Sequence, residues 1–183
     1  CSIGHGAAAC ADAGPLAPLS HRNSPVPIPP RSTPLAVGDV APDFTLQDQN
    51  RKDWKLSDAV RKGDVVLSVI PFAFTGVCGT EMGCISKDAA TWQGKGATVV
   101  GLCCDSPFAN AAWAAKEGYA HTILSDLHRE VAKGYGIHWP EMNVAQRATI
   151  HIGKSADGVG RVKFIQTRPP GQAMDWAGVL GML

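Results

Sequence analysis

The sequence predicts an α/β fold in which a central mixed β-sheet is flanked by helices. Two continuous apolar runs, Val65–Ile70 and Ala97–Cys104, have the composition of strands that are buried on both faces. Segments with helical character follow both runs, and the chain closes with a predicted β-hairpin and one more helix. Strands that alternate with helices in this way are typical of a sheet covered by helices.

A β extension is predicted before the first central strand. Residues 37–46 are expected to form an extended segment that ends in a short strand, and residues 54–56 a second, edge strand. Ser57 is expected to cap a short helix over residues 58–61, because serine is a favoured N-cap residue.

The first central strand leads to a cysteine. Pro71 ends the strand, because proline cannot donate to the β-ladder. A loop through Thr75 then brings Cys78 into the first turn of a helix that is predicted to run to about Trp92. The free N–H groups and the positive end of the helix dipole favour the thiolate form of cysteine. The sequence therefore predicts an activated thiol.

The second central strand starts the other half of the chain. Ser106 is the expected N-cap of the next helix, with Pro107 in its first turn, and this helix stops before Gly118. The remaining elements are expected in the following order: a strand over residues 121–124, a helix over 126–135 capped by Ser125, hairpin strands over 147–152 and 160–165, and a closing helix over 172–183.

Composition excludes several classes of protein. A formal net charge of +1 gives no electrostatic reason to expect nucleic acid or an anionic membrane as a partner. No apolar run approaches the roughly 18 residues that a membrane span needs. The chain also has no C-x-x-C pair, the usual signature of zinc ribbons and of dithiol oxidoreductases. We therefore expect neither a metal nor another cofactor.

The first residues differ from the rest. Residues 1–34 are rich in proline and alanine and lack hydrophobic periodicity, so they are predicted to be a disordered leader before a single domain over residues 35–183. The expected location is the cytoplasm. An organelle is the alternative if the leader, which is poor in acidic residues, is a transit peptide.

The pattern Pro71-x-x-x-Thr75-x-x-Cys78 resembles the signature of the peroxiredoxins, which are thiol peroxidases with a thioredoxin-like fold. The residues around it are most similar to the one-cysteine alkyl hydroperoxide reductase E branch, with the bacterioferritin-comigratory branch as neighbour. Further blocks that resemble the family, in its order and spacing, are Val37–Leu46, Asp105–Phe108, Leu124–Asp126, Val131–Gly136 and Ala145–Ile150. Together they cover about residues 36–183.

The resemblance implies a peroxidase that reduces hydrogen peroxide and organic hydroperoxides, in antioxidant defence and redox homeostasis. Cys78 would be the peroxidatic nucleophile and become a sulfenic acid. Thr75 would orient the thiolate and the peroxide. Arg147 would stabilise the thiolate and the transition state, Glu81 would position Arg147, and Pro71 would shield the sulfur from water.

How the sulfenic acid is reduced stays open. Cys84 follows Cys78 by six residues, a spacing that puts the two Cα atoms roughly 10 Å apart on an intact helix, beyond the ~7 Å limit for a disulfide. We therefore favour reduction by an external thiol, namely thioredoxin, a glutaredoxin-like protein or a low-molecular-weight thiol. An atypical two-cysteine cycle with Cys84 as resolving residue is the alternative. The resemblance also implies a homodimer.

Other classes of function compete with the peroxidase. One is a non-peroxidase thioredoxin-like redox or binding module, and another is a scaffold that only keeps the fold. A metal-binding module would have to draw on Cys78, Cys84, Cys103, Cys104 and on His121, His128, His138 or His151. Their spacings match no standard zinc pattern, and Cys103 and Cys104 are expected to serve in packing.

Overall fold

A computed structural model describes residues 27–183 of the protein. Most of the predicted leader lies outside the described residues. Its last part, residues 27–34, has no helix or strand but lies along helix α5 (Glu130–Gly134), where the Arg31 N–H donates to the Lys133 carbonyl at 3.0 Å. The division of the chain at residue 34 stays a prediction. No helix within residues 27–183 is long and apolar enough to cross a membrane.

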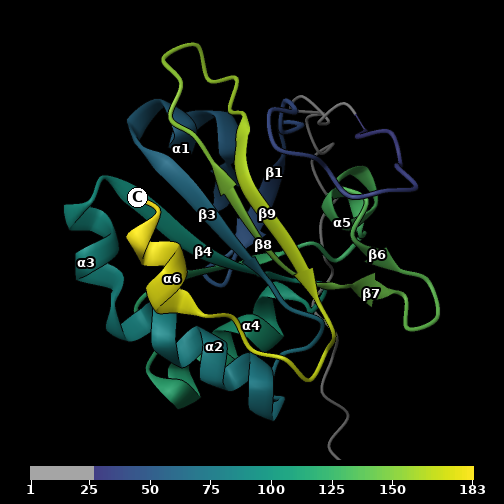
Figure 1. Ribbon diagram of the computed structural model, residues 1–183. Helices are drawn as coiled ribbons and strands as arrows, with labels where there is room; N and C mark the ends of the chain where they lie inside the picture. Colours follow the sequence, from purple (N-terminus) through teal and green to yellow (C-terminus); the bar gives the residue numbers. More distant parts are fainter. Residues whose placement is uncertain (1–26) are drawn as a thin grey trace, which may run out of the picture.

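A seven-stranded sheet in the order β2-β1-β5-β4-β3-β8-β9 forms the centre of the molecule (Figure 1). Its strands are β1 (Thr45–Asp48), β2 (Asp53–Lys55), β3 (Asp64–Val69), β4 (Ala97–Cys103), β5 (Thr122–Ser125), β8 (Arg147–Ile152) and β9 (Val162–Arg168). Strands β3, β4 and β5 run parallel, whereas all other neighbours in the sheet are antiparallel. The predicted mixed sheet, its N-terminal β extension and its terminal hairpin are thus confirmed.

Helices cover both faces of the sheet. They are α1 (Leu56–Lys62), α2 (Gly76–Lys87), α3 (Ala89–Gly94), α4 (Pro107–Glu117), α5 (Glu130–Gly134) and α6 (Trp176–Gly181). Alternation along β3 explains the two layers, because Val65 and Leu67 point into one core while Val66 points into the other. Helices α1 and α5 pack on the first core, and α2, α3, α4 and α6 cover the second (Figure 1).

Strand register brings β3 and β8 together where the site lies. Val69, the last residue of β3, pairs with Ala148 of the antiparallel β8. Arg147, the first residue of β8, therefore lies beside the point where the chain leaves the sheet for the loop to Cys78. The carboxyl ends of parallel strands are the usual place for a reactive site in such sheets.

The helix predicted from Cys78 to Trp92 is wrong as a single element. Helix α2 begins two residues earlier, at Gly76, and the backbone leaves helical geometry at Asp88 (φ −93°, ψ 10°) before α3 starts. Hydrophobic periodicity does not reveal the break, because Ile85 before it and Trp92 after it are buried in the same core.

Two predicted serine caps are also wrong, while Ser106 does cap α4 by accepting from the Ala109 N–H at 3.2 Å. Ser57 lies inside α1, where the Asp43 carboxylate accepts from its N–H at 2.8 Å. Helix α5 starts at Glu130 rather than at residue 126, so Ser125 is a strand residue.

The remaining differences concern short elements near the ends of the chain. The closing helix is shorter than predicted, because Asp175 caps α6 with a side-chain oxygen that accepts from the Gly178 N–H at 3.1 Å. A separate two-stranded sheet was not predicted; it consists of β6 (His138–Trp139) and β7 (Val144–Ala145). Strands of two residues are too short to give an alternating pattern.

Candidate active site

Cys78 is the third residue of α2 and thus lies in its first turn. Thr75 has the extended backbone of an N-cap residue (φ −106°, ψ 150°), and its carbonyl accepts the first helical hydrogen bond, from the Gly79 N–H at 2.8 Å. The N–H groups of residues 76–78 therefore have no acceptor in the helix and point toward its N-terminal end. The Cys78 side chain is buried, with 2% of its surface exposed. Its sulfur therefore lies near the positive end of the α2 dipole.

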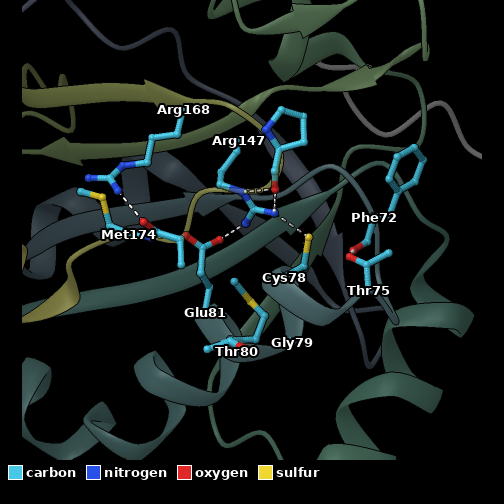
Figure 2. Close-up of polar contacts among 12 residues, drawn as sticks. Phe72, Thr75, Cys78, Gly79, Thr80, Glu81, Arg147, Arg168 and Met174 are labelled. Atoms are coloured by element: carbon cyan, nitrogen blue, oxygen red, sulfur yellow. Dashed lines mark hydrogen bonds and ion pairs between the residues drawn. The ribbon is translucent and has the colours of Figure 1, made fainter.

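Arg147 approaches the cysteine from β8. Its Nη2 lies 3.1 Å from the Cys78 sulfur, and the same nitrogen and Nε both donate to the Pro170 carbonyl, at 2.8 and 3.1 Å (Figure 2). Only 3% of the Arg147 surface is exposed. A buried guanidinium in contact with the sulfur stabilises negative charge there, because solvent screens the interaction little.

Glu81 holds the opposite side of the guanidinium. One carboxylate oxygen accepts from Arg147 Nη1 and the other accepts from the Met174 N–H at 2.7 Å (Figure 2). Burial raises the pKa of Glu81, while the Arg147 guanidinium and the Met174 N–H oppose that rise. Because Glu81 is only 2% exposed, it is not a solvated acid of the first turn. Its two hydrogen bonds fix both the arginine and the C-terminal segment.

Thr75 and Pro71 belong to the loop between β3 and α2. The Thr75 hydroxyl donates to the Phe72 carbonyl at 3.1 Å, so in this state it is directed into the loop rather than at the sulfur (Figure 2). Pro71 is buried directly after the strand. The loop is anchored by Asp105, whose carboxylate accepts from the Ala73 N–H at 2.9 Å.

A surface hollow of about 310 Å³ opens beside this loop. It is lined by Phe74, Thr75, Gly76, Gly79, Trp113, Lys116 and Glu117. A second hollow, of about 330 Å³, adjoins Arg147 next to β9 but is not lined by Cys78 or Thr75. The first hollow is therefore the one that reaches the N-terminus of α2.

The described residues contain three cysteines besides Cys78, and all four are free thiols. Cys84 is half-buried on α2, and the helix is continuous from Cys78 to Cys84. Cys103 and Cys104 lie in different cores, and the Cys103 thiol donates to Asn110 Oδ1 at 3.1 Å. Burial raises the pKa of Cys103 strongly and that of Cys104 to about 11, so both remain protonated at neutral pH.

Among residues 27–183, the histidines do not gather around the cysteines. His151 and His138 pair with Asp64 and Asn143, at 2.7 and 3.1 Å, and His121 lies against Met82. Within residues 27–183, no three His, Cys, Asp or Glu side chains are arranged to hold a metal ion.

Two parts of the site come from backbone groups that the sequence analysis missed, the Pro170 carbonyl and the Met174 N–H. Backbone groups carry no residue-type signature. The sequence did carry one signal, the two consecutive prolines Pro169 and Pro170. In the structure Arg168, which directly precedes them, pairs with Arg147 across the hairpin. Prolines cannot continue the ladder, so the chain has to leave the sheet beside Arg147.

The sheet order and the position of the cysteine define a thiol-dependent oxidoreductase with a thioredoxin-like fold. The chain belongs to the AhpC/TSA family, which matches residues 37–157. It is 29% identical over 154 residues to alkyl hydroperoxide reductase E of Mycobacterium bovis, covering 81% of this chain and 98% of that protein. Peroxiredoxin-2 of Cricetulus griseus is 34% identical over 151 residues, covering 77% and 75%.

Solved structures agree with this assignment. Peroxidoxin BcpB from Mycobacterium tuberculosis superimposes with a TM-score of 0.70 at 26% identity, covering 79% of this chain and 94% of that one. AhpC from the same organism gives a TM-score of 0.71 at 23% identity, covering 81% and 96%, and so supports the fold. Together with the relatives named as peroxiredoxins and thiol peroxidases, these findings support thiol-dependent peroxide reduction by this chain.

Proposed function

We propose that Cys78 is the peroxidatic residue of this thiol-dependent peroxidase. The contact between the Arg147 guanidinium and the Cys78 sulfur, at 3.1 Å, is the observation that carries the proposal. Attack on a peroxide needs a thiolate, and a buried cation and a helix N-terminus at one sulfur both favour that form. The other described cysteines lack this environment.

The first half of the reaction is a displacement at oxygen. The Cys78 thiolate attacks one peroxide oxygen of ROOH, the O–O bond breaks, and RO⁻ leaves and takes up a proton to become ROH. Sulfur is oxidised to the sulfenic acid Cys78–SOH, and the peroxide is reduced. Arg147 and the free N–H groups of the first turn of α2 stabilise the charge that develops on the leaving oxygen.

The loop residues complete the site. Thr75 lies at the edge of the hollow that reaches the N-terminus of α2, and rotation of its side chain would turn the hydroxyl from the Phe72 carbonyl toward the sulfur and an incoming peroxide. Pro71, buried beside the end of β3, would keep bulk water from the thiolate. Glu81 would act through Arg147, whose guanidinium it orients.

The second half of the reaction would use an external thiol. A first thiol R′SH would attack Cys78–SOH, releasing water and forming a mixed disulfide, and a second would release Cys78–SH and R′SSR′. Candidate reductants are thioredoxin, a glutaredoxin-like protein or a low-molecular-weight thiol. The intact α2 supports this one-cysteine cycle over resolution by Cys84, because both cysteines lie within the helix.

The cellular setting follows from resemblance alone. We propose a homodimer, as the resemblance to peroxiredoxins implies, and a cytoplasmic location, with an organelle as the alternative. Substrates would be hydrogen peroxide and organic hydroperoxides, consistent with relatives named for alkyl hydroperoxide reduction.

Stopped-flow measurement of peroxide consumption tests the proposal. Cys78→Ser should abolish consumption above the uncatalysed rate, whereas Cys84→Ser should retain the wild-type rate with an external thiol as reductant. Equal rates for wild type and Cys78→Ser would refute the assignment. Loss of multiple turnovers in Cys84→Ser alone would instead favour the two-cysteine cycle.

A further inference from the structure

Three consecutive residues between α4 and β5 each contact α2, at three positions along the helix. The contacts are a hydrogen bond from the Tyr119 hydroxyl to the Gly79 carbonyl at 3.1 Å, one from the Ala120 N–H to Ser86 Oγ at 2.8 Å, and an approach of His121 Nε2 to Met82 Sδ at 3.3 Å. We call residues 119–121 the α2 clamp. Its contacts extend from the turn that holds Cys78 to the last turn of the helix.

Residues of α4 and β4 pack around the α2 clamp and its partner Met82. The Tyr119 ring packs edge-on against Trp113 of α4, with 5.2 Å between centroids, and lies 5.4 Å from the His121 ring. Met82 is fully buried, and Gly101 of β4 leaves the room that its sulfur occupies, since a Cβ there would lie 2.8 Å from Sδ. The Tyr119 and His121 contacts are therefore parts of one packed layer, and the hydrogen bond of Ala120 to Ser86 lies at its exposed edge.

The Tyr119 hydroxyl is a constant donor. Burial, with a smaller contribution from nearby Glu117 and Cys78, raises the pKa of Tyr119 to about 12. The phenol thus stays protonated over the pH range in which a thiol peroxidase works. The acceptor is the carbonyl of Gly79, which directly follows Cys78. The hydrogen bond therefore holds the turn that has to move if Cys78 is to leave the site.

Resolution by Cys84 would require that movement. The two cysteines lie on one intact helix at a separation that is too large for a disulfide, so the first turn of α2 would have to unwind. Unwinding displaces the Gly79 carbonyl from Tyr119 and disturbs the buried contact of Met82 with His121. The glycines at positions 79 and 83 ease unwinding, and the clamp opposes it.

We propose that Tyr119 is a positioning residue that, with Ala120 and His121, keeps α2 wound while Cys78 is a thiolate or a sulfenic acid and so prevents Cys84 from reacting with oxidised Cys78. This inference rests on the proposed function of Cys78. The reaction that the clamp suppresses is attack of the Cys84 thiol on Cys78–SOH, which would form the S–S bond and release water. With that route closed, the sulfenic acid waits for an external thiol.

Tyr119→Phe tests the clamp, because it removes the hydroxyl and keeps the ring. Tyr135→Phe is the matched control: its hydroxyl also donates to a backbone carbonyl, that of Pro42 at 2.8 Å, but in the other core. Ser86→Ala removes the acceptor at the far end of the helix. Each protein receives one equivalent of hydrogen peroxide without reductant, and mass spectrometry then distinguishes sulfenic acid from disulfide.

We expect sulfenic acid at Cys78 in wild type and Tyr135→Phe, and a Cys78–Cys84 disulfide in Tyr119→Phe. Adding Cys84→Ser to Tyr119→Phe should abolish the disulfide. In the reduced proteins, amide hydrogen exchange over residues 76–84 should be roughly threefold to tenfold faster in Tyr119→Phe, with a smaller increase in Ser86→Ala, as expected for the loss of one hydrogen bond. Tyr135→Phe should leave exchange in this segment unchanged.

Two results would overturn the clamp: a Cys78–Cys84 disulfide in wild type, or wild-type exchange and persistent sulfenic acid in Tyr119→Phe. Failure of the proposed function is distinct. If Cys78 is not oxidised in any of the proteins while exchange in α2 still accelerates in Tyr119→Phe, the catalytic role of Cys78 is refuted and the hold of Tyr119 on the helix is supported.

Discussion

Arg147 Nη2 lies 3.1 Å from the sulfur of Cys78, although 69 residues separate them in the chain. The contact exists because β8 runs antiparallel beside β3 and begins where β3 ends. The guanidinium also donates to Glu81 and to the Pro170 carbonyl, so four of its five N–H donors are engaged before a peroxide arrives. A site whose donors are fixed in advance has little reorganisation to undergo during the reaction.

Arg147→Lys should slow peroxide reduction by on the order of 10²-fold, comparable to the loss of one preorganised donor to a transition state. Lysine keeps the charge, but a single ammonium cannot serve Cys78, Glu81 and the Pro170 carbonyl in one geometry. Stopped-flow kinetics measure the effect. Arg161→Lys, at an exposed arginine, is the control and should match wild type. An active Arg147→Lys enzyme would show that charge alone suffices.

Glu81→Gln should lower the rate by about tenfold and the free energy of unfolding by about 3 kcal/mol, because it leaves the buried Arg147 charge without its anion. Glutamine can still accept from the Met174 N–H, so the C-terminal segment keeps its contact. Urea denaturation and peroxide kinetics together test this. Glu141→Gln, at an exposed glutamate, should change neither quantity. Full activity in Glu81→Gln would mean that Pro170 orients the arginine unaided.

Much of the site could be predicted from local features. A buried strand, a proline and a helix start place Cys78, and one helical turn places Glu81 behind it. That Arg147 meets both was predictable only through resemblance, since pairing of β8 with β3 is a long-range property. The contacts of the Pro170 carbonyl and the Met174 N–H could not be predicted from the sequence, because these are backbone groups that almost any residue could supply.

The helix starts show how side chains can mislead. Ser125 has the residue type of a cap, but the Asp126 carboxylate, one position later, accepts from the Val131 and Ala132 N–H groups at 3.2 and 2.8 Å. This bridge spans a turn in which Arg129 has a positive φ of 58°. Local patterns cannot show that a buried carboxylate satisfies a helix from outside its first turn.

Protonation of the buried His121 side chain should contribute a loss of stability in acid. Burial lowers the pKa of His121 from 6.5 to about 4. Between these two pH values the unfolded chain binds a proton at His121, whereas the folded state keeps the imidazole neutral. The stability that His121 contributes is present above pH 6.5 and is lost as the pH falls toward 4, by up to about 3 kcal/mol. His121→Phe should remove this loss. Urea denaturation between pH 7 and pH 4 measures it, and parallel curves for the two proteins would contradict the prediction.

Asp126 should act in the opposite direction over nearly the same range. Burial raises its pKa from 3.8 to about 6, despite the N–H groups that it accepts from, so the folded state binds a proton more tightly than the unfolded chain. Its contribution to stability is greatest below pH 4 and declines as the pH rises through 6, by up to about 3 kcal/mol. Relative to wild type, Asp126→Asn should therefore gain stability between pH 4 and pH 7, whatever its offset at pH 4.

The two variants together separate these contributions. In wild type the contributions of His121 and Asp126 to the pH dependence of the unfolding free energy largely cancel between pH 4 and pH 6. They have opposite signs because burial lowers the pKa of His121 and raises that of Asp126. Asp126→Asn alone should expose the acid loss due to His121, and the double variant with His121→Phe should be flatter than Asp126→Asn. A steeper curve for the double variant would show that another buried group governs acid stability.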